Sequence, residues 1–221
     1  MDLREPAVKS KSRRGCLLFL GASGYDARVV AAVLSIALAS GAPRPLVDAV
    51  RVVPGLRLDI RYATARNITG RPLYAAGRCL LLPETAAALA RVQARLVRSR
   101  RRLLVWDCYR PPSAQRALWK IFPHPGWVAD PRTGSNHERG TAVDLTLADA
   151  SGRPLLMPTD FDSFDPRARQ GATRGIPREA LENRERLRAA MRAEGFITIR
   201  KEWWHYDLPG ARSHPILDVP L

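Results

Sequence analysis

Two short segments of this 221-residue chain contain residue types that could together bind a metal ion. The first, at 135–144, contains His137 and Asp144, and the second, at 202–205, reads Glu-Trp-Trp-His. Two imidazoles and one carboxylate would leave one coordination position open, which is the arrangement of a catalytic zinc site. The remaining carboxylate, that of Glu202, could take a proton from a water molecule at the open position. The two segments therefore predict the zinc site of a hydrolytic enzyme.

The first segment must turn between its two ligand candidates. His137 and Asp144 are an odd number of residues apart, so a regular strand would place them on opposite faces. The Arg-Gly pair at 139–140 supplies a turn that removes this objection. Asp144 is flanked by Val143 and Leu145, and a carboxylate in such apolar surroundings needs a partner. That partner could be a metal or an arginine, and the segment alone leaves both open.

The second segment must bend as well. Glu202 and His205 are also an odd number of residues apart, which suits Glu202 to a place beside the metal rather than on it. Trp203 and Trp204 between them would line the site and lower its dielectric constant, which strengthens electrostatic interactions. The alternative is that both tryptophans pack in the core, and the two interpretations are compatible.

Helices and short strands are expected to position these segments. Helices are expected at 83–100, 111–122 and 178–194, because proline opens each one. The strands that we expect lie at 50–53, 58–62, 103–106, 142–147 and 196–200. Strands and helices do not alternate regularly, which predicts a single α+β domain with a central antiparallel sheet flanked by helices and the zinc site at the sheet. This domain is expected to span 43–221.

The first 42 residues predict a secretory signal peptide. A basic stretch at 9–14 precedes an apolar run at 29–39, followed by small residues suited to signal peptidase. The apolar run is too short to span a membrane comfortably. We therefore expect export, with the periplasm as the destination. The alternative is an uncleaved N-terminal extension on a cytoplasmic protein.

The composition indicates a soluble globular protein without a nucleic-acid partner. The chain is 46% hydrophobic and 26% charged, with a formal net charge of +15. Most of the excess charge is arginine dispersed along the chain, and no basic stripe alternates with aromatic residues as nucleic-acid binding would require.

Two cysteines, Cys79 and Cys108, lie beyond the predicted signal peptide. An even number of cysteines in an exported domain predicts a disulfide. Two buried thiols in a cytosolic protein are the alternative. This prediction and the prediction of export depend on each other.

The two metal-ligand segments resemble those of the zinc D-alanyl-D-alanine dipeptidases of the VanX type, which belong with the LAS-type peptidoglycan peptidases. The resemblance rests on Ser-x-His-x-x-Gly-x-Ala-x-Asp at 135–144 and Glu-x-Trp-His at 202–205. It runs from about Val50 to the C-terminus, and further matches lie at 59–64, 67–70, 107–111 and 161–162. One departure is Cys108, where the best-known members have glycine. Another is the length of the loop between Asp144 and Asp162.

This resemblance implies a role for each residue of the site. His137, Asp144 and His205 would bind one zinc ion per chain. Glu202 would act as the general base, and Arg110 would stabilise negative charge on the scissile carbonyl, a task that its permanent charge suits. Taken alone, Arg110 could equally form a surface ion pair.

The resemblance also implies a small substrate. Tyr62, Ser135 and Asp162 match positions that line the substrate pocket, and Asp162 is the natural partner for the ammonium group of a D,D-dipeptide. The implied activity is hydrolysis of D-alanyl-D-alanine in cell-wall peptide metabolism. The alternatives are a D,D-carboxypeptidase acting on longer wall peptides and a zinc-binding module without turnover. The oligomeric state cannot be predicted from the sequence.

Overall fold

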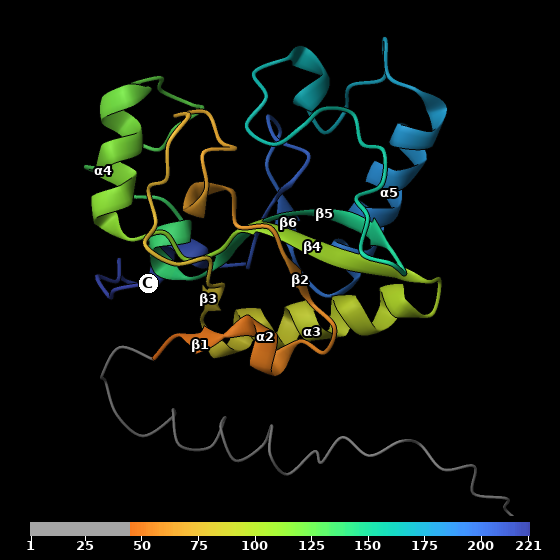
Figure 1. The fold of residues 1–221 in the computed structure, drawn as a ribbon, viewed down its shortest axis with the longest axis horizontal. Helices are drawn as coiled ribbons and strands as arrows, with labels where there is room; N and C mark the ends of the chain where they lie inside the picture. Colours follow the sequence, from red (N-terminus) through yellow and green to blue (C-terminus); the bar gives the residue numbers. More distant parts are fainter. Residues whose placement is uncertain (1–44) are drawn as a thin grey trace, which may run out of the picture. The chain divides into compact units, whose positions relative to one another are not determined.

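The longest strands of the computed structural model, β4 (Arg101–Asp107) and β5 (Ala142–Asp149), pair antiparallel near the middle of a five-stranded sheet (Figure 1). The structure describes residues 45–221, so the signal peptide predicted at 1–42 lies outside the described residues. Both strands are buried along almost their whole length, as their continuous apolar runs indicate. Asp144 is therefore carried into the interior of the protein.

The sheet is mixed, with the strand order β2-β4-β5-β7-β6. From β4 to β6 every pair is antiparallel, and only β2 runs parallel to its neighbour β4. The predicted α+β fold is confirmed. The sheet differs from the predicted antiparallel one in that its edge strand β2 is parallel to β4. The shorter strands of this sheet are β2 (Arg57–Leu58), β6 (Ile197–Thr198) and β7 (His205–Asp207).

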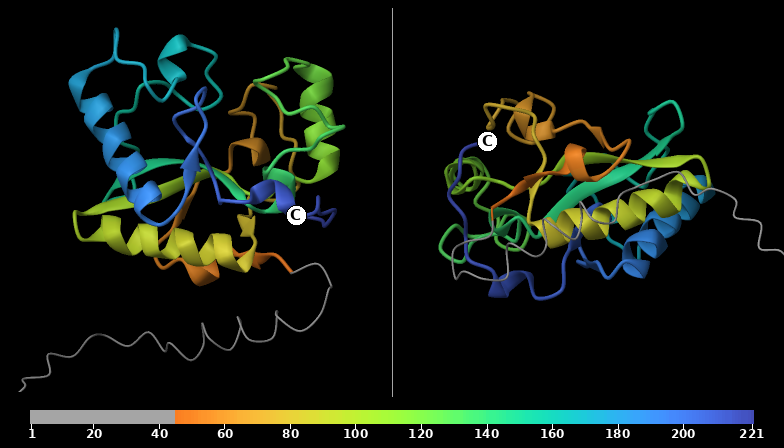
Figure 2. Two further views of the ribbon diagram at one scale, coloured as in Figure 1. Left: turned by 180° about the vertical axis from the view of Figure 1, so that it is seen from behind. Right: turned by 90° about the horizontal axis from the view of Figure 1, so that it is seen from below.

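The three predicted helices are confirmed to within a few residues. They are α3 (Pro83–Val97), α4 (Pro112–Ile121) and α5 (Arg178–Ala193). Helices α3 and α5 contact each other and cover one face of the sheet, α3 against β4 and α5 against β5 (Figure 2). Irregular segments cover the opposite face. The end of α5 is fixed by Gly195, whose φ of +90° is a conformation that glycine adopts without strain.

The predicted strand at 50–53 is wrong, because these residues form most of the short helix α2 (Ala49–Val52). The side chain of Asp48 caps this helix by accepting a hydrogen bond from the main-chain N–H of Val50. A four-residue segment with three valines does not distinguish a strand from a short helix, so the capping residue was the better signal.

The predicted strand at 58–62 is also largely wrong, because β2 ends at Leu58 and a 3-10 turn, η1 (Arg61–Ala63), follows. The carboxylate of Asp59 pairs with the guanidinium groups of Arg61 and Arg66. These local ion pairs hold the chain in a turn that the alternation of residue types does not reveal.

A disulfide joins Cys79 to Cys108, as predicted. Cys79 directly precedes β3 (Leu80–Leu81), which pairs with β1 (Val47–Asp48) in a separate two-stranded sheet, and Cys108 directly follows β4. The bond therefore ties the small sheet to the end of the central strand that leads to Arg110.

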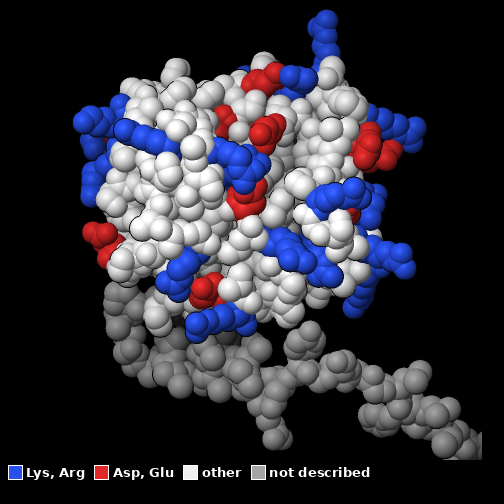
Figure 3. Space-filling view, in the orientation of Figure 1, with Lys and Arg blue, Asp and Glu red and all other residues white. Residues whose placement is uncertain are grey.

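Two further observations concern the outside of the molecule. Between residues 45 and 221, no helix has the length and apolar character needed to cross a bilayer. On the face drawn in Figure 3, Lys and Arg side chains occur in several separate groups, with Asp and Glu side chains between them. This face therefore carries no continuous basic patch.

Candidate active site

The three predicted metal ligands come from one turn and two neighbouring strands. Asp144 of β5 lies directly opposite His205 of β7 in the antiparallel register. His137 begins the 3-10 turn η2 (His137–Arg139), which ends at Gly140 with a φ of +66°. A Cβ atom at Gly140 would lie only 3.2 Å from the main-chain nitrogen of Leu82, so glycine is needed there for both conformation and space. The predicted turn at 139–140 thus brings His137 back over Asp144.

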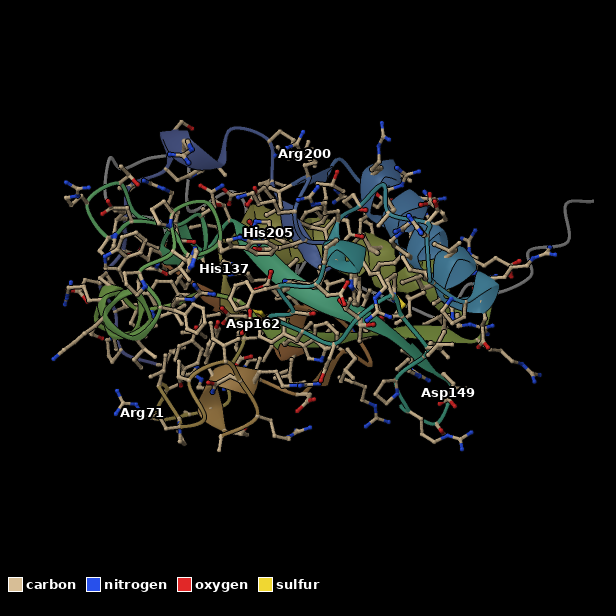
Figure 4. All side chains as sticks on the ribbon, turned by 90° about the horizontal axis from the view of Figure 1, so that it is seen from above. Arg71, His137, Asp149, Asp162, Arg200 and His205 are labelled. Carbon is tan, nitrogen blue, oxygen red and sulfur yellow. A yellow bond between two sulfur atoms is a disulfide. The ribbon has the colours of Figure 1, made fainter. Side chains whose placement is uncertain are left out.

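The ligand atoms of these three residues converge. His137 Nε2 lies 3.2 Å from His205 Nδ1 and 3.3 Å from Asp144 Oδ2, and His205 Nδ1 lies 2.9 Å from Asp144 Oδ1. All three side chains are buried, and together they form a group that could hold a metal ion. Figure 4 shows His137 and His205 side by side above the central strands.

The outer nitrogen of each imidazole has an acceptor. His137 Nδ1 lies 2.7 Å from the main-chain oxygen of Cys108, which can only accept, so Nδ1 carries the proton and Nε2 is left with a lone pair. His205 Nε2 lies 2.9 Å from Asp207 Oδ1, which favours a proton on Nε2 and a lone pair on Nδ1. Two lone pairs and the carboxylate of Asp144 then face one point, a donor set that fits a cation.

The electrostatics of the pocket also favour a cation. Burial lowers the pKa of His205, but hydrogen bonds to Asp144 and Asp207 outweigh this effect and raise it. Burial raises the pKa of Asp144, but both imidazoles outweigh this effect and lower it. A positive charge at this point, whether a proton or a metal, is therefore stabilised by the surrounding carboxylates.

Glu202 lies beside the ligand group rather than within it. It precedes β7 in an irregular segment, and its Oε2 is 3.9 Å from His205 Nδ1. Burial raises the pKa of Glu202 to about 7, with Asp144 adding to the effect and the imidazoles opposing it. The bend predicted between Glu202 and His205 is present. Trp203 and Trp204 are both buried, and Trp204 also lines the cavity, so it serves both the core and the site.

Arg110 is buried in an ion pair and is not at the surface. Its Nη2 and Nε donate to Asp107 Oδ2 at 2.7 and 3.1 Å, and its Nη1 donates to Gln115 Oε1 at 2.9 Å. The guanidinium carbon lies 4.9 Å from the centre of the Tyr62 ring. These contacts fix the orientation of a permanent positive charge at the cavity.

Tyr62, which packs against the Arg110 guanidinium, also contacts Asp162. The Tyr62 hydroxyl donates to Asp162 Oδ2 at 2.8 Å. Asp162 has a φ of +56°, a left-handed conformation that aspartate tolerates better than most residues. Burial, with the nearby Asp144, raises the pKa of Asp162 well above its ordinary value. The ionised form of Asp162 is therefore unfavourable unless a cation lies beside it.

All the residues predicted for catalysis, metal binding or substrate binding line one cavity of about 610 Å³. Ser135 is among them; its Oγ accepts a hydrogen bond from the main-chain N–H of His137 at 3.2 Å. The eight predicted residues at this cavity are Tyr62, Arg110, Ser135, His137, Asp144, Asp162, Glu202 and His205. The fold thus brings together residues that are up to 143 positions apart in the chain (205 − 62).

A family model described as D-ala-D-ala dipeptidase matches residues 43–220. The chain belongs to the D-Ala-D-Ala dipeptidase family. It is 42% identical to the D-alanyl-D-alanine dipeptidase of Escherichia coli over 172 residues, which cover 78% of this chain and 89% of that protein. It is 36% identical to the D-alanyl-D-alanine dipeptidase of Streptomyces coelicolor, over 77% of this chain and 95% of that protein. The protein of the same name from Enterococcus faecalis is 35% identical over 70% of this chain and 86% of its own length.

Several residues that support the site in this member of the family were not singled out from the sequence. Asp107 holds Arg110 and also accepts a hydrogen bond from the hydroxyl of Tyr74 at 2.7 Å. Asp207 holds His205, and Gln115 holds Arg110. Asp107 stands within the matched segment at 107–111, and Asp207 follows the second ligand segment by two residues. Their closeness to the predicted site residues in the sequence was the only signal that could have identified them. Their partners became evident only from the packing.

Proposed function

We propose that this protein is a zinc-dependent peptidase that hydrolyses the dipeptide D-alanyl-D-alanine. The observation that carries the proposal is the convergence of His137, Asp144 and His205 on one point of a cavity, with Glu202 beside them. Two imidazoles and one carboxylate are a donor set typical of catalytic zinc. When bound there, zinc would polarise the peptide carbonyl and make a water molecule more acidic.

Glu202 supplies the acid–base chemistry. As a carboxylate it accepts a proton from the attacking water, and it then gives that proton to the amine that leaves. A pKa raised by burial above its ordinary value suits both transfers, because it brings the two protonation states closer in free energy near neutral pH.

Arg110 supplies a fixed positive charge for the negative charge that develops on the carbonyl oxygen. Asp107 and Gln115 hold its guanidinium in place, so little reorganisation is needed during the reaction. Tyr62 packs against the guanidinium and keeps water from that side.

Asp162 recognises the free amine of the dipeptide. Its carboxylate is buried, accepts the hydroxyl hydrogen of Tyr62, and has no cation as a hydrogen-bonding partner among residues 45–221. The ammonium group of a dipeptide would supply that charge and favour the ionised carboxylate. A longer peptide has an acylated nitrogen at this position and cannot do so, which favours a dipeptidase over a carboxypeptidase.

We also propose that the protein is exported to the periplasm and acts in cell-wall peptide metabolism. The Cys79–Cys108 disulfide supports export, because such bonds persist in oxidising compartments. Cell fractionation of the native source would test this. Recovery of the protein with cytoplasmic markers and with free thiols would contradict it.

The activity is tested with purified zinc-loaded protein on D-Ala-D-Ala and on a pentapeptide ending in D-Ala-D-Ala, each with a chelated control. We expect cleavage of the dipeptide alone and its loss on chelation. Cleavage of the pentapeptide would move the protein to the carboxypeptidase alternative and remove the role given to Asp162. A zinc-loaded protein that cleaves neither peptide would support the alternative of a binding module.

A further inference from the structure

Glu202 lies in an irregular segment, 199–204, between β6 and β7. A side chain in such a segment is not aligned by the hydrogen bonds of a helix or a strand. A base must nevertheless keep its carboxylate within reach of the attacking water, because a displacement of about 1 Å can lower the rate about a hundredfold. The main chain at Glu202 therefore has to be held by contacts from another part of the fold.

Gln170, in the loop between β5 and α5, supplies such contacts. Its side chain is buried, and its Nε2 donates to the main-chain oxygen of Trp203 at 3.2 Å and lies 3.5 Å from that of Glu202. Its main-chain N–H donates to the Arg200 oxygen at 3.1 Å. Within residues 45–221, no other side chain donates to the main-chain oxygens of Glu202 and Trp203.

The same loop holds Trp203, the residue that follows the base, in two further ways. The main-chain N–H of Trp203 donates to the Ala168 oxygen at 2.9 Å, and its indole Nε1 donates to Thr159 Oγ1 at 2.9 Å. The N–H and the indole of Trp203 are therefore bonded to the loop independently of Gln170. The contact to the carbonyl groups is the one that depends on a single side chain.

Gln170 is itself attached to a rigid element. The buried side chain of Arg184 in α5 donates through Nη1 to the main-chain oxygens of Arg169, at 3.3 Å, and Ala172, at 2.7 Å. These two residues lie on either side of Gln170 in the loop. The amide of Gln170 is thus presented from a fixed support, as a group that orients its neighbour must be.

We propose that Gln170 is a positioning residue for Glu202. Its amide fixes the main chain of Glu202 and Trp203, so that the carboxylate stays beside His205. Gln170 is neither a member of the metal-ligand group nor part of the cavity lining, so its effect on the reaction must pass through Glu202. This inference rests on the proposed peptidase activity, in which Glu202 is the base.

Gln170→Met keeps the length of the side chain and removes the donor. We expect kcat for D-Ala-D-Ala to fall about tenfold to a hundredfold, because the base is less firmly placed. KM and zinc content should change little. The matched control is Gln93→Met, because Gln93 is also buried and bonded to main chain, with Nε2 donating to the Gly55 oxygen at 3.1 Å, and does not line the cavity. This control should keep its kcat.

A double-mutant cycle with Glu202→Gln distinguishes positioning from a general structural role. If Gln170 acts through Glu202, adding Gln170→Met to Glu202→Gln should cause no further loss of the residual rate, measured at high enzyme concentration. A structural role would lower the rate by the same factor in both backgrounds. That result, or an unchanged kcat in Gln170→Met alone, overturns the inference.

Hydrogen exchange separates this inference from the proposed activity. In zinc-loaded protein, the peptide that covers 200–206 should exchange faster in Gln170→Met than in the unaltered protein or in Gln93→Met. Faster exchange supports the role of Gln170 in holding this main chain, even where the unaltered protein cleaves no peptide and the proposed activity fails. Unchanged exchange overturns the inference, while cleavage of D-Ala-D-Ala by the unaltered protein still upholds the activity.

Discussion

The imidazole of His137 donates through Nδ1 to the main-chain oxygen of Cys108, 2.7 Å away, and the sulfur of Cys108 is bonded to Cys79. A covalent cross-link thus fixes the residue that orients a proposed zinc ligand. The neighbouring main chain reinforces this arrangement, because Arg110 N–H donates to the His137 oxygen at 3.2 Å. Stability and metal binding are therefore expected to depend on the same disulfide.

Removal of the disulfide should weaken both properties. For the Cys79→Ser, Cys108→Ser double variant, closure of a loop of this length predicts a loss of about 3 kcal/mol in the free energy of unfolding. A less firmly held Cys108 oxygen should also lower zinc affinity, by up to about tenfold. Urea denaturation of metal-free protein measures the first effect, and competition with a zinc chelator measures the second. Unchanged zinc affinity in a folded double variant would show that the disulfide serves stability alone.

Replacement of Glu202 should greatly reduce turnover and preserve the metal site. The side chain lies outside the ligand group, so Glu202→Gln is expected to retain one zinc ion per chain. Without a general base, kcat should fall at least about a hundredfold to a thousandfold. Metal analysis and steady-state kinetics on the same preparation check both statements. Near-normal turnover would contradict the assignment of Glu202 as the base.

The pH dependence of the reaction should report the ionisation of Glu202. The base acts as a carboxylate, so kcat/KM should fall as the pH falls through the pKa of Glu202. Burial raises this pKa from 4.5 to about 7, and the positive charge of a bound metal acts in the opposite direction. The midpoint of the acid limb is therefore expected between these two values. A rate independent of pH over that interval would contradict the expectation, and Glu202→Gln, assayed at high enzyme concentration, should lack the limb.

Asp207 should matter for metal affinity although it is two residues from the nearest ligand. Its Oδ1 accepts a hydrogen bond from His205 Nε2, which leaves Nδ1 to face Asp144. Loss of such an outer partner typically lowers metal affinity about tenfold to a hundredfold, so Asp207→Ala should release zinc more readily. Asp218→Ala, at an exposed aspartate, is the matched control. Equal affinities in the two variants would mean that His205 is oriented by its main chain alone.

The sequence was informative where residue type alone restricts structure. Proline marked the starts of α3, α4 and α5, and the apolar runs marked β4 and β5. The ligand set of His137, Asp144 and His205 could be predicted because the two segments together resemble those of a known family, although each residue alone left other roles open. The helix starts and the buried strands depend on neighbours in the sequence, which are visible without a structure.

What could not be predicted depends on contacts between distant residues. The parallel pairing of β2 with β4 and the turn η1 after it depend on packing and on the ion pairs of Asp59. The burial of Arg110 was equally hidden, since nothing local indicates that Gln115 and Asp107 both turn towards it. Cooperation of the side chains around the site therefore required three-dimensional information.

Asp162 should decide whether the enzyme accepts a dipeptide. Asp162→Asn keeps the shape of the side chain, and asparagine tolerates the left-handed conformation at this position, so the fold should be preserved. Loss of the negative charge should raise KM for D-Ala-D-Ala about tenfold to a hundredfold, since a charged hydrogen bond is removed. Asp160→Asn, two residues away and with a largely exposed side chain, is the matched control.

The same variant distinguishes the two peptidase classes. A neutral side chain at position 162 no longer favours an ammonium group, so the preference for D-Ala-D-Ala over N-acetyl-D-Ala-D-Ala should narrow in Asp162→Asn. In the native protein the Asp162 carboxylate is buried, so an ionised carboxylate without a cation beside it is costly, and an acylated substrate nitrogen leaves it in that state. The neutral side chain of Asp162→Asn has no such cost, so the preference for the free amine should narrow. Specificity constants for the two compounds, measured in parallel for both proteins, give the ratio directly. An unchanged ratio would remove Asp162 from amine recognition and favour a carboxypeptidase, in which the amino side of the substrate is an extended peptide.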